Sequence, residues 1–320
     1  MAAPLQQAEP KHFERAWGES ARWKSTLILI HPIGVLLYVL MTLVCALIAE
    51  RGLPPARQLV PLLVAMFCSQ SVVGIANEVA DRNLDARTKP WRPLPSGHVS
   101  PRAATSLGLL FTILSVAAAS KLSIPAAALL FCGTATGVVY DIWLKRTPLS
   151  WLPYVVTYPG FPLWVWLALG HLGDPATLQS GPAAWLASVQ GDPRLPRLLA
   201  VYPVLIPLAL AAHLCNQLRD FDEDLAAGTR GVVHYLGKPA ALRACFALLA
   251  LGPLPMLATA SRGPQLLVVL AAAVFHWIVT AIGMRRYQAG GAANDLRRLF
   301  RLLQLSGPLL ALTWLAGALG

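Results

Sequence analysis

Nine apolar segments, each long enough to cross a lipid bilayer as a helix, dominate this 320-residue chain. A membrane-spanning helix needs about 20 mostly apolar residues. Only 13% of the residues are charged, about half the share found in soluble domains. The sequence therefore predicts an all-α integral membrane protein with nine transmembrane helices, near residues 26–49, 58–80, 103–120, 123–143, 150–170, 198–218, 240–260, 264–283 and 299–318.

The domain organisation follows from what separates these segments. No polar or Pro/Ser-rich linker of domain-separating length interrupts them, so residues 1–320 are predicted to form a single membrane domain. Residues 1–23 are polar and charged, and the apolar run after them, about 27–49, is too long for a signal-peptide core. We therefore expect residues 1–23 to be retained as a cytoplasmic tail.

The basic residues gather in alternate loops. If the N-terminus lies inside, 20 of the 26 Lys and Arg residues fall on the cytoplasmic side. The positive-inside rule then predicts a cytoplasmic N-terminus and a C-terminus on the opposite side, in a membrane of bacterial type. The net charge of +11 is explained by a basic face on an anionic leaflet, and nucleic-acid binding is not expected.

Seven of the 15 acidic residues fall in two short clusters, each at the cytoplasmic end of a predicted span. On an α-helix, positions four residues apart lie on one face. Each span is thus expected to present an amide and two carboxylates in a column, a set of oxygen ligands that suits Mg²⁺. Acidic, solvated helix ends are the alternative, which the repeated spacing disfavours. Both clusters read N-x3-D-x3-D: Asn77, Asp81 and Asp85, then Asn216, Asp220 and Asp224.

Basic residues accompany both clusters. Together with a metal ion, Lys and Arg on the phosphate oxygens would make a diphosphate a good leaving group. For any single base, the alternative is an ordinary cytoplasmic loop charge. The predicted diphosphate-binding residues are Asn77, Lys89, Arg92, Tyr140, Lys145, Arg146, Asn216 and Arg219.

These motifs resemble the UbiA superfamily of membrane prenyltransferases. The resemblance covers most of the chain and includes the runs at 77–85, 92–97, 140–146 and 216–224. Two departures are His31-Pro32, where the family often has Arg-Pro, and the 228–231 run, where it often has Gly-x-x-Thr. The resemblance implies nine helices around a central cavity. It also implies Mg²⁺ holding a polyprenyl diphosphate between two catalytic aspartate pairs, Asp81 and Asp85 with Asp220 and Asp224, and an allylic carbocation captured by an acceptor.

The acceptor is left open. The run at 92–97 is similar to members that alkylate chlorophyllide or glycerol phosphate lipids, whereas the run at 216–220 is more like members that prenylate dihydroxynaphthoate. An aromatic or quinone precursor is the family's commonest class. His213 lies about two helical turns before Asp220 and could take the proton that such an acceptor loses. A hydrogen-bonded core histidine is the alternative.

Two other functions deserve comparison. Some UbiA relatives cyclise their prenyl diphosphate without an external acceptor, and aromatic faces such as those of Trp143, Trp164, Trp166 and Trp277 could stabilise the cation. Membrane-interface or lipid-facing packing is the simpler account of any one of them. A transporter is disfavoured, because transporter sites lie near the midplane, whereas these clusters lie at one face.

Overall fold

The computed structural model describes residues 22–200, 202–226, 228–259, 264–288, 302, 309–314 and 316. Over this part of the chain it is built from helices, and it packs as two compact units, residues 1–42 with 60–142 and residues 43–59 with 143–320. Nearly all of the predicted tail 1–23 and most of the predicted span 299–318 lie outside the described residues. The single domain stays a prediction.

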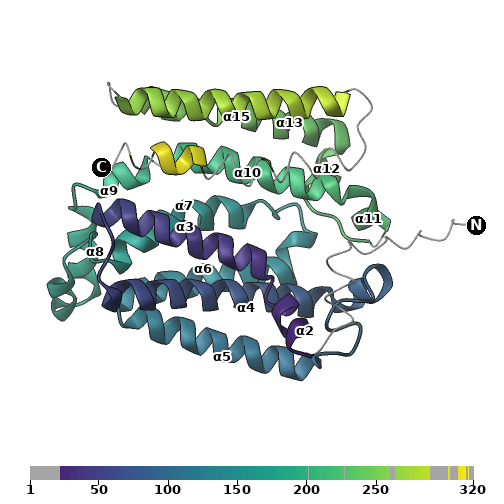
Figure 1. Ribbon diagram of the computed structural model, residues 1–320, viewed down its shortest axis with the longest axis horizontal. Helices are drawn as coiled ribbons and strands as arrows, with labels where there is room; N and C mark the ends of the chain where they lie inside the picture. The colour runs from purple at the N-terminus through teal and green to yellow at the C-terminus, as the bar shows by residue number, and fades with distance from the viewer. Residues whose placement is uncertain are drawn as a thin grey trace, which may run out of the picture. The chain divides into compact units, whose positions relative to one another are not determined.

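The first unit contains the N-terminal helices. Its α5 begins at Pro101, and the hydroxyl of Ser100 caps the helix by accepting a hydrogen bond from the Ala103 N–H at 3.1 Å. Helix α5 packs against α6 (Figure 1). The helices are α2 (Arg22–Leu29), the first part of α3 (Pro32–Glu50), most of α4 (Ala56–Thr88), α5 (Pro101–Ser120) and α6 (Ile124–Ile142).

A small apolar core holds the loop after α4 in place. Leu94 from this loop packs with Leu29 and Ile30 at the end of α2, with Ile75 of α4 and with Ala104 of α5. All five side chains are buried. The loop that follows the first acidic cluster is therefore anchored to the helix that carries the cluster.

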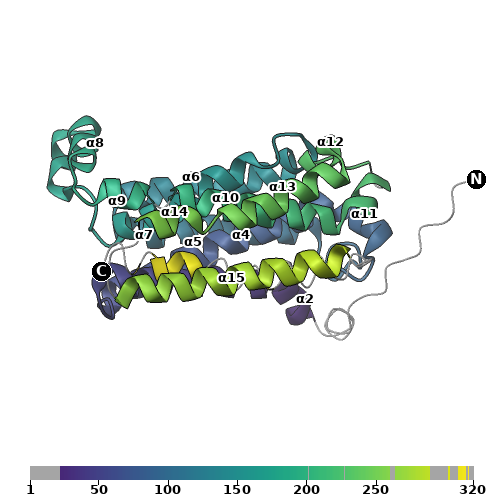
Figure 2. The same cartoon turned by 90° about the horizontal axis from the view of Figure 1, so that it is seen from above.

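The second unit is organised around α10, which packs against α7, α12, α13 and α14. Helices α10 and α13 run side by side in both views (Figures 1 and 2). Its elements are η1 (Leu144–Arg146), α7 (Leu152–Ala168), η2 (Pro175–Ser180), α8 (Pro182–Gln190), α9 (Leu195–Leu199), α10 (Tyr202–Arg219), α11 (Phe221–Ala226), α12 (Val232–Leu236), α13 (Lys238–Leu251), α14 (Leu254–Thr259) and α15 (Pro264–Gln288).

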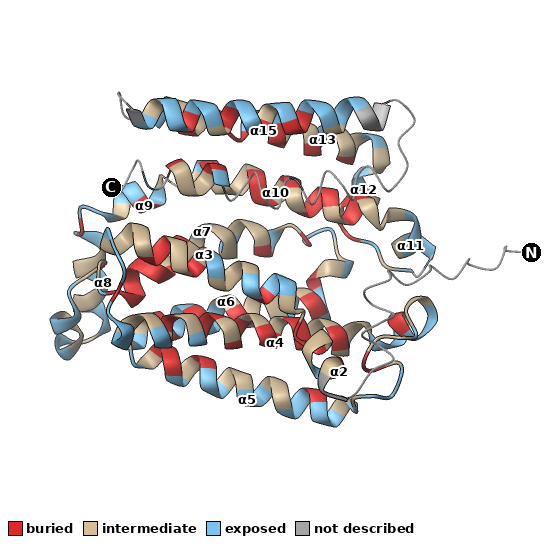
Figure 3. Cartoon of the chain, in the orientation of Figure 1, coloured by how far each residue is buried: buried red, intermediate tan, exposed pale blue. Residues whose placement is uncertain are grey.

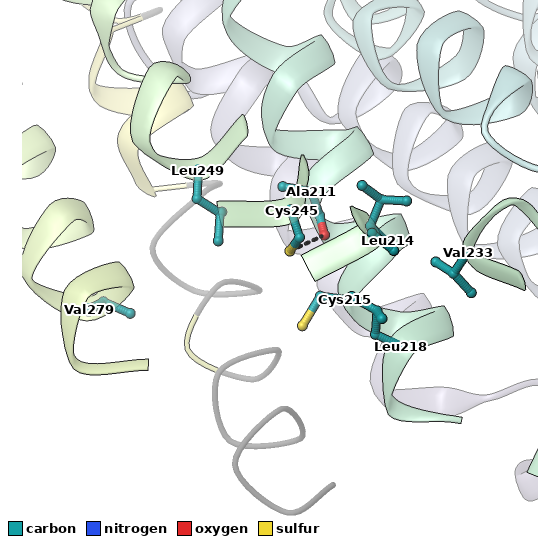
Figure 4. Packing of buried hydrophobic residues seen from close by; sticks show 9 residues of the cluster. Ala211, Leu214, Cys215, Leu218, Val233, Cys245, Leu249 and Val279 are labelled. Carbon is teal, nitrogen blue, oxygen red and sulfur yellow. Dashed lines mark hydrogen bonds between the residues drawn. The ribbon is translucent and has the colours of Figure 1, made fainter. Parts of the chain in front are cut away.

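Figure 4 shows the core that fixes the end of α10. The Sγ of Cys245 in α13 donates to the backbone carbonyl of Ala211 in α10 at 3.5 Å. Burial of this apolar surface holds α10 where the second acidic cluster begins. The buried residues of the core are Ala211, Leu214, Cys215, Leu218, Val233, Ala241, Cys245, Leu249 and Val279.

Large apolar side chains also cover the outside of the helices, as expected where lipid is the solvent. Figure 3 shows exposed residues along α5 and α15, among them Ile113 and Leu267. Among the described residues, seven helices are long and apolar enough to span a membrane. Helix α7, which covers the predicted span 150–170, has 17 residues and is not one of the seven. The all-α prediction is confirmed, whereas the count of nine is not.

Candidate active site

The first motif lies on one uninterrupted helix, α4, which has 33 residues. The side-chain amide of Asn77 donates to Asp81 Oδ2 at 3.3 Å and to Asp141 Oδ1 at 2.8 Å. Asn77 and Asp81 are half-buried, and Asp85, one turn further on, is buried. The predicted helical column is therefore present here.

Asp141 joins this motif from α6, and the sequence analysis did not select it. Its carboxylate is buried beside Asn77. One signal was available, because acidic residues next to membrane helices are costly and usually functional. Asp141 has no N-x3-D partner in its own segment, so the spacing that marked the other aspartates could not identify it.

A charged network adjoins the first motif. Glu78, whose side chain is fully buried, forms an ion pair with Arg92 and contacts the Nε2 of His31 at 2.8 Å. The Nζ of Lys89 lies 3.8 Å from Asp85 Oδ1. Two predicted diphosphate ligands, Lys89 and Arg92, thus lie beside the motif, and Arg92 is already engaged by a carboxylate that the sequence analysis left unassigned.

The second motif differs from its prediction. Helix α10 ends at Arg219, Asp220 lies in a turn, and Asp224 belongs to the separate helix α11. The expectation of a single helical column is therefore wrong for this motif. The cause is local: aspartate is favoured directly before a helix, and acidic residues in a first turn are stabilised by the helix dipole. The first turn of α11 contains Asp222, Glu223 and Asp224.

Basic residues also lie beside the second motif. The Nε of Arg219 donates to Asp220 Oδ1 at 2.8 Å, and its Nη2 contacts Oδ2. Lys238 Nζ lies 2.9 Å from Asp222 Oδ2. Asn216 on α10 and Asp224 on α11 are half-buried. Arg219, a predicted diphosphate ligand, is thus in contact with a motif carboxylate.

Ser150 connects α10 to the segment after the second motif. Its hydroxyl oxygen lies 3.1 Å from His213 Nε2, 3.2 Å from Gln217 Nε2 and 3.0 Å from the backbone nitrogen of Val232. A Cβ on Gly231 would lie 2.1 Å from Gln217 Nε2, so a larger residue would displace the Gln217 side chain from this arrangement. His213 is therefore a buried part of this network, and its role as a base stays a prediction.

The remaining predicted residues are placed as follows. Tyr140 is half-buried near the end of α6, in the first unit. Lys145 and Arg146 lie on η1, in the second unit. Trp164 and Trp166 are buried in α7, whereas Trp143 is exposed and Trp277 is half-buried, with its indole N–H donating to Ala250 O at 2.9 Å.

The donor types suit magnesium. Among the described residues, no three His, Cys, Asp or Glu side chains converge as a metal-binding group. Mg²⁺ usually keeps several waters and binds through one or two carboxylates together with substrate phosphates. Each motif supplies carboxylates and an amide oxygen, which are the hard ligands that such a partial site requires.

Known proteins are similar to this chain over most of its length. The sequence is 27% identical over 286 residues to digeranylgeranylglyceryl phosphate synthase of Methanopyrus kandleri, covering 88% of this chain and 97% of that one. It is 27% identical over 259 residues to 4-hydroxybenzoate octaprenyltransferase of Vibrio cholerae, covering 80% and 82%. A UbiA homologue of Archaeoglobus fulgidus, solved with DMAPP and Mg²⁺, has a similar fold, with a TM-score of 0.63, 17% identity and coverage of 89% and 99%.

The family itself is shown by a match that spans most of the sequence. Residues 38–304 match the UbiA prenyltransferase family, and this range includes both acidic motifs. The resemblance seen in the sequence is confirmed. The chain therefore belongs to the UbiA prenyltransferase family and is a multi-pass membrane enzyme that transfers prenyl groups.

Proposed function

We propose that this enzyme transfers a prenyl group from a polyprenyl diphosphate to an aromatic or quinone-precursor acceptor in a Mg²⁺-dependent reaction. The observation that carries the proposal is the first motif, in which the amide of Asn77 gathers the carboxylates of Asp81 and Asp141 at 3.3 and 2.8 Å. Two carboxylates gathered at one amide are hard oxygen ligands of the kind that Mg²⁺ takes, and a bound cation would stabilise them. The Archaeoglobus fulgidus homologue was solved with a prenyl diphosphate and Mg²⁺.

Under this proposal, the two motifs serve one diphosphate. The catalytic and metal-binding residues are Asn77, Asp81, Asp85, Asn216, Asp220 and Asp224. When bound, Mg²⁺ would neutralise the charge of the departing diphosphate. The residues proposed for its remaining oxygens, on a face that we expect to be cytoplasmic, are Lys89, Arg92, Tyr140, Lys145, Arg146 and Arg219.

The acceptor class rests on the relatives. One is named for 4-hydroxybenzoate and the other for a glyceryl phosphate lipid. These acceptors differ in size and polarity, but each would give up one proton when it is alkylated. We favour an aromatic acceptor, because relatives from Vibrio and Aeromonas are named for 4-hydroxybenzoate.

Product analysis tests the proposal. The purified protein in lipid nanodiscs would receive prenyl diphosphates of several lengths, each with 4-hydroxybenzoate, dihydroxynaphthoate or a glycerol phosphate lipid. We expect a prenylated aromatic product and stoichiometric pyrophosphate, both abolished by EDTA and restored by Mg²⁺. A cyclic hydrocarbon formed without acceptor would identify a cyclase instead. Full activity in EDTA would contradict the metal dependence.

A further inference from the structure

His31 occupies an unusual backbone conformation between two helices. Helix α2 ends at Leu29 and α3 begins at Pro32, and His31 between them has a φ of +54°. Positive φ is uncommon for residues other than glycine, and such strain persists only where the surrounding structure enforces it. Here the proline disfavours a right-handed helical conformation at His31.

Helix α4 enforces the same break from the other side. A Cβ added to Gly74 would lie 2.9 Å from the backbone oxygen of Ile30, so the two backbones approach closely at this point. Leu29 and Ile30 are buried. The interruption between α2 and α3 is therefore fixed by packing, and it directs the His31 side chain toward α4.

The result is a carboxylate–imidazole pair beside the first motif. His31 Nε2 lies 2.8 Å from Glu78 Oε1, and the charged groups that face the ring are Glu78 from α4 and Arg92 from the following loop. Arg92 Nη1 also lies 3.3 Å from Nε2, but the shorter contact is with the carboxylate, and an ionised carboxylate only accepts hydrogen bonds. We therefore assign the hydrogen to Nε2, which donates it to Glu78. In the neutral ring, Nδ1 is then the basic nitrogen.

Access and position both suit a reaction at Nδ1. The His31 side chain is 36% exposed, whereas the carboxylate that orients it is fully buried. The second oxygen of that carboxylate, Glu78 Oε2, is buried and makes no hydrogen bond among the described residues. Glu78 is adjacent to Asn77 and one turn before Asp81 on α4, so the imidazole lies next to the proposed diphosphate site.

We propose that His31 is a catalytic residue that takes the proton released by the acceptor, with Glu78 positioning the ring; this inference rests on the proposed function. The allylic carbon–oxygen bond breaks and its electron pair leaves with the diphosphate. The acceptor carbon or oxygen bonds to the prenyl carbon, and its hydrogen passes as a proton to Nδ1 of His31. Aromatic and hydroxyl acceptors each lose one proton, so the inference holds for both.

The substitution His31→Asn separates chemistry from structure. Asparagine tolerates positive φ and keeps an N–H donor for Glu78, but its amide cannot take up a proton. We expect kcat to fall about 100-fold, within the usual range for a general base. The pH profile of kcat should differ between wild type and the variant, because only the imidazole can take up a proton at this position.

A second variant and a binding measurement complete the test. Added imidazole should restore part of the kcat lost in His31→Gly, while Mg²⁺-dependent binding of the prenyl diphosphate should match wild type in both variants. The exposed His98→Asn should behave as wild type. Wild-type kcat and pH profile in His31→Asn would overturn the inference, as would equal loss of binding and turnover. If the proposed function itself were wrong, the wild-type protein would give no prenylated product.

Discussion

The two acidic motifs have the same spacing but different backbones. The first lies on the continuous helix α4, whereas the second is divided between α10 and α11 at Asp220. A hydrogen bond from the Asp224 N–H to the Asp220 carbonyl, 2.8 Å long, keeps one helical turn between the two carboxylates across the break. The comparison shows that equal spacing can preserve the separation of two ligands without preserving the helix.

The largest expected effect is loss of turnover when either motif loses a carboxylate. Asp81→Ala and Asp220→Ala should each lower kcat/KM by about 10³-fold, because several kcal/mol of charge stabilisation would be removed at about 1.4 kcal/mol per tenfold. Initial rates at saturating Mg²⁺ measure this. Asp222→Ala, in the second cluster but outside the spacing, should stay near wild type. A mild Asp220→Ala would show that the motifs are not equivalent.

Proline substitutions test the difference between the two backbones directly. Asn83→Pro falls in the interior of α4 and should cost about 3 kcal/mol or more in folding free energy, with loss of activity. Glu223→Pro falls in the first turn of α11, where proline is tolerated, and should cost less than about 1 kcal/mol. Thermal unfolding of both variants measures the difference. Equal damage would mean that the second motif is also a continuous helix.

Alanine substitutions at two glycines, one near each motif, should lower the folding stability by different amounts. In Gly74→Ala the new Cβ would lie 2.9 Å from a backbone oxygen, and we expect a loss of about 1–3 kcal/mol from overpacking. In Gly231→Ala it would meet the end of the Gln217 side chain, and we expect about 1 kcal/mol from a weakened hydrogen bond. Gly133→Ala, with nothing within 4 Å, is the control. Melting temperatures in the reverse order would contradict this.

The smallest expected effect is on folding stability, at the ion pair between Asp192 and Arg194, which belongs to neither motif. Burial alone would raise the pKa of Asp192, but hydrogen bonds from Arg194 and the Gly173 N–H hold that pKa below its usual value. Because the pKa is lower in the folded protein, the carboxylate stabilises it at neutral pH, and this is lost progressively below about pH 4.

Asp192→Asn should therefore cost less than about 1 kcal/mol at pH 7, because the Arg194 side chain is 46% exposed. Thermal unfolding at pH 7 and near pH 3 would follow the difference, which should become smaller at the lower pH. Prenyl transfer should be unaffected, in contrast to Asp220→Ala. If Asp192→Asn lost as much activity as Asp220→Ala, the loss in Asp220→Ala could be explained by a broken acid–arginine pair rather than by a lost metal ligand.

Hydropathy predicted the all-α membrane fold, because every span must be long enough to cross the bilayer. The orientation inferred from loop charge stays a prediction. The span at 103–120 corresponds to α5 within two residues, whereas the span at 26–49 covers the second half of α2 and most of α3. The end of α10 at Arg219 was not predicted, because an apolar periodicity cannot show where a capping aspartate begins a new helix. The break at His31 depends on a close approach to Gly74, which lies 43 positions away.

The sequence predicted only part of the candidate site, because its spacing indicates helical neighbours but not tertiary contacts. A repeated spacing identified Asp81 and Asp220 as motif members, since helical neighbours are also sequence neighbours. Asp141, Glu78 and Ser150 reach their partners across 64, 47 and 63 positions. Such tertiary contacts leave no periodic signal in a single sequence.

The Ser150 contacts determine the tautomer of His213. The hydroxyl oxygen accepts hydrogen bonds from Gln217 Nε2 and the Val232 N–H, so its own hydrogen points to His213 Nε2. A neutral His213 therefore carries its hydrogen on Nδ1. Protonation of Nε2 would require the hydroxyl to turn away and would leave three donors for its two lone pairs, so proton uptake by this ring would weaken the Ser150 hydrogen bond with Gln217 or Val232.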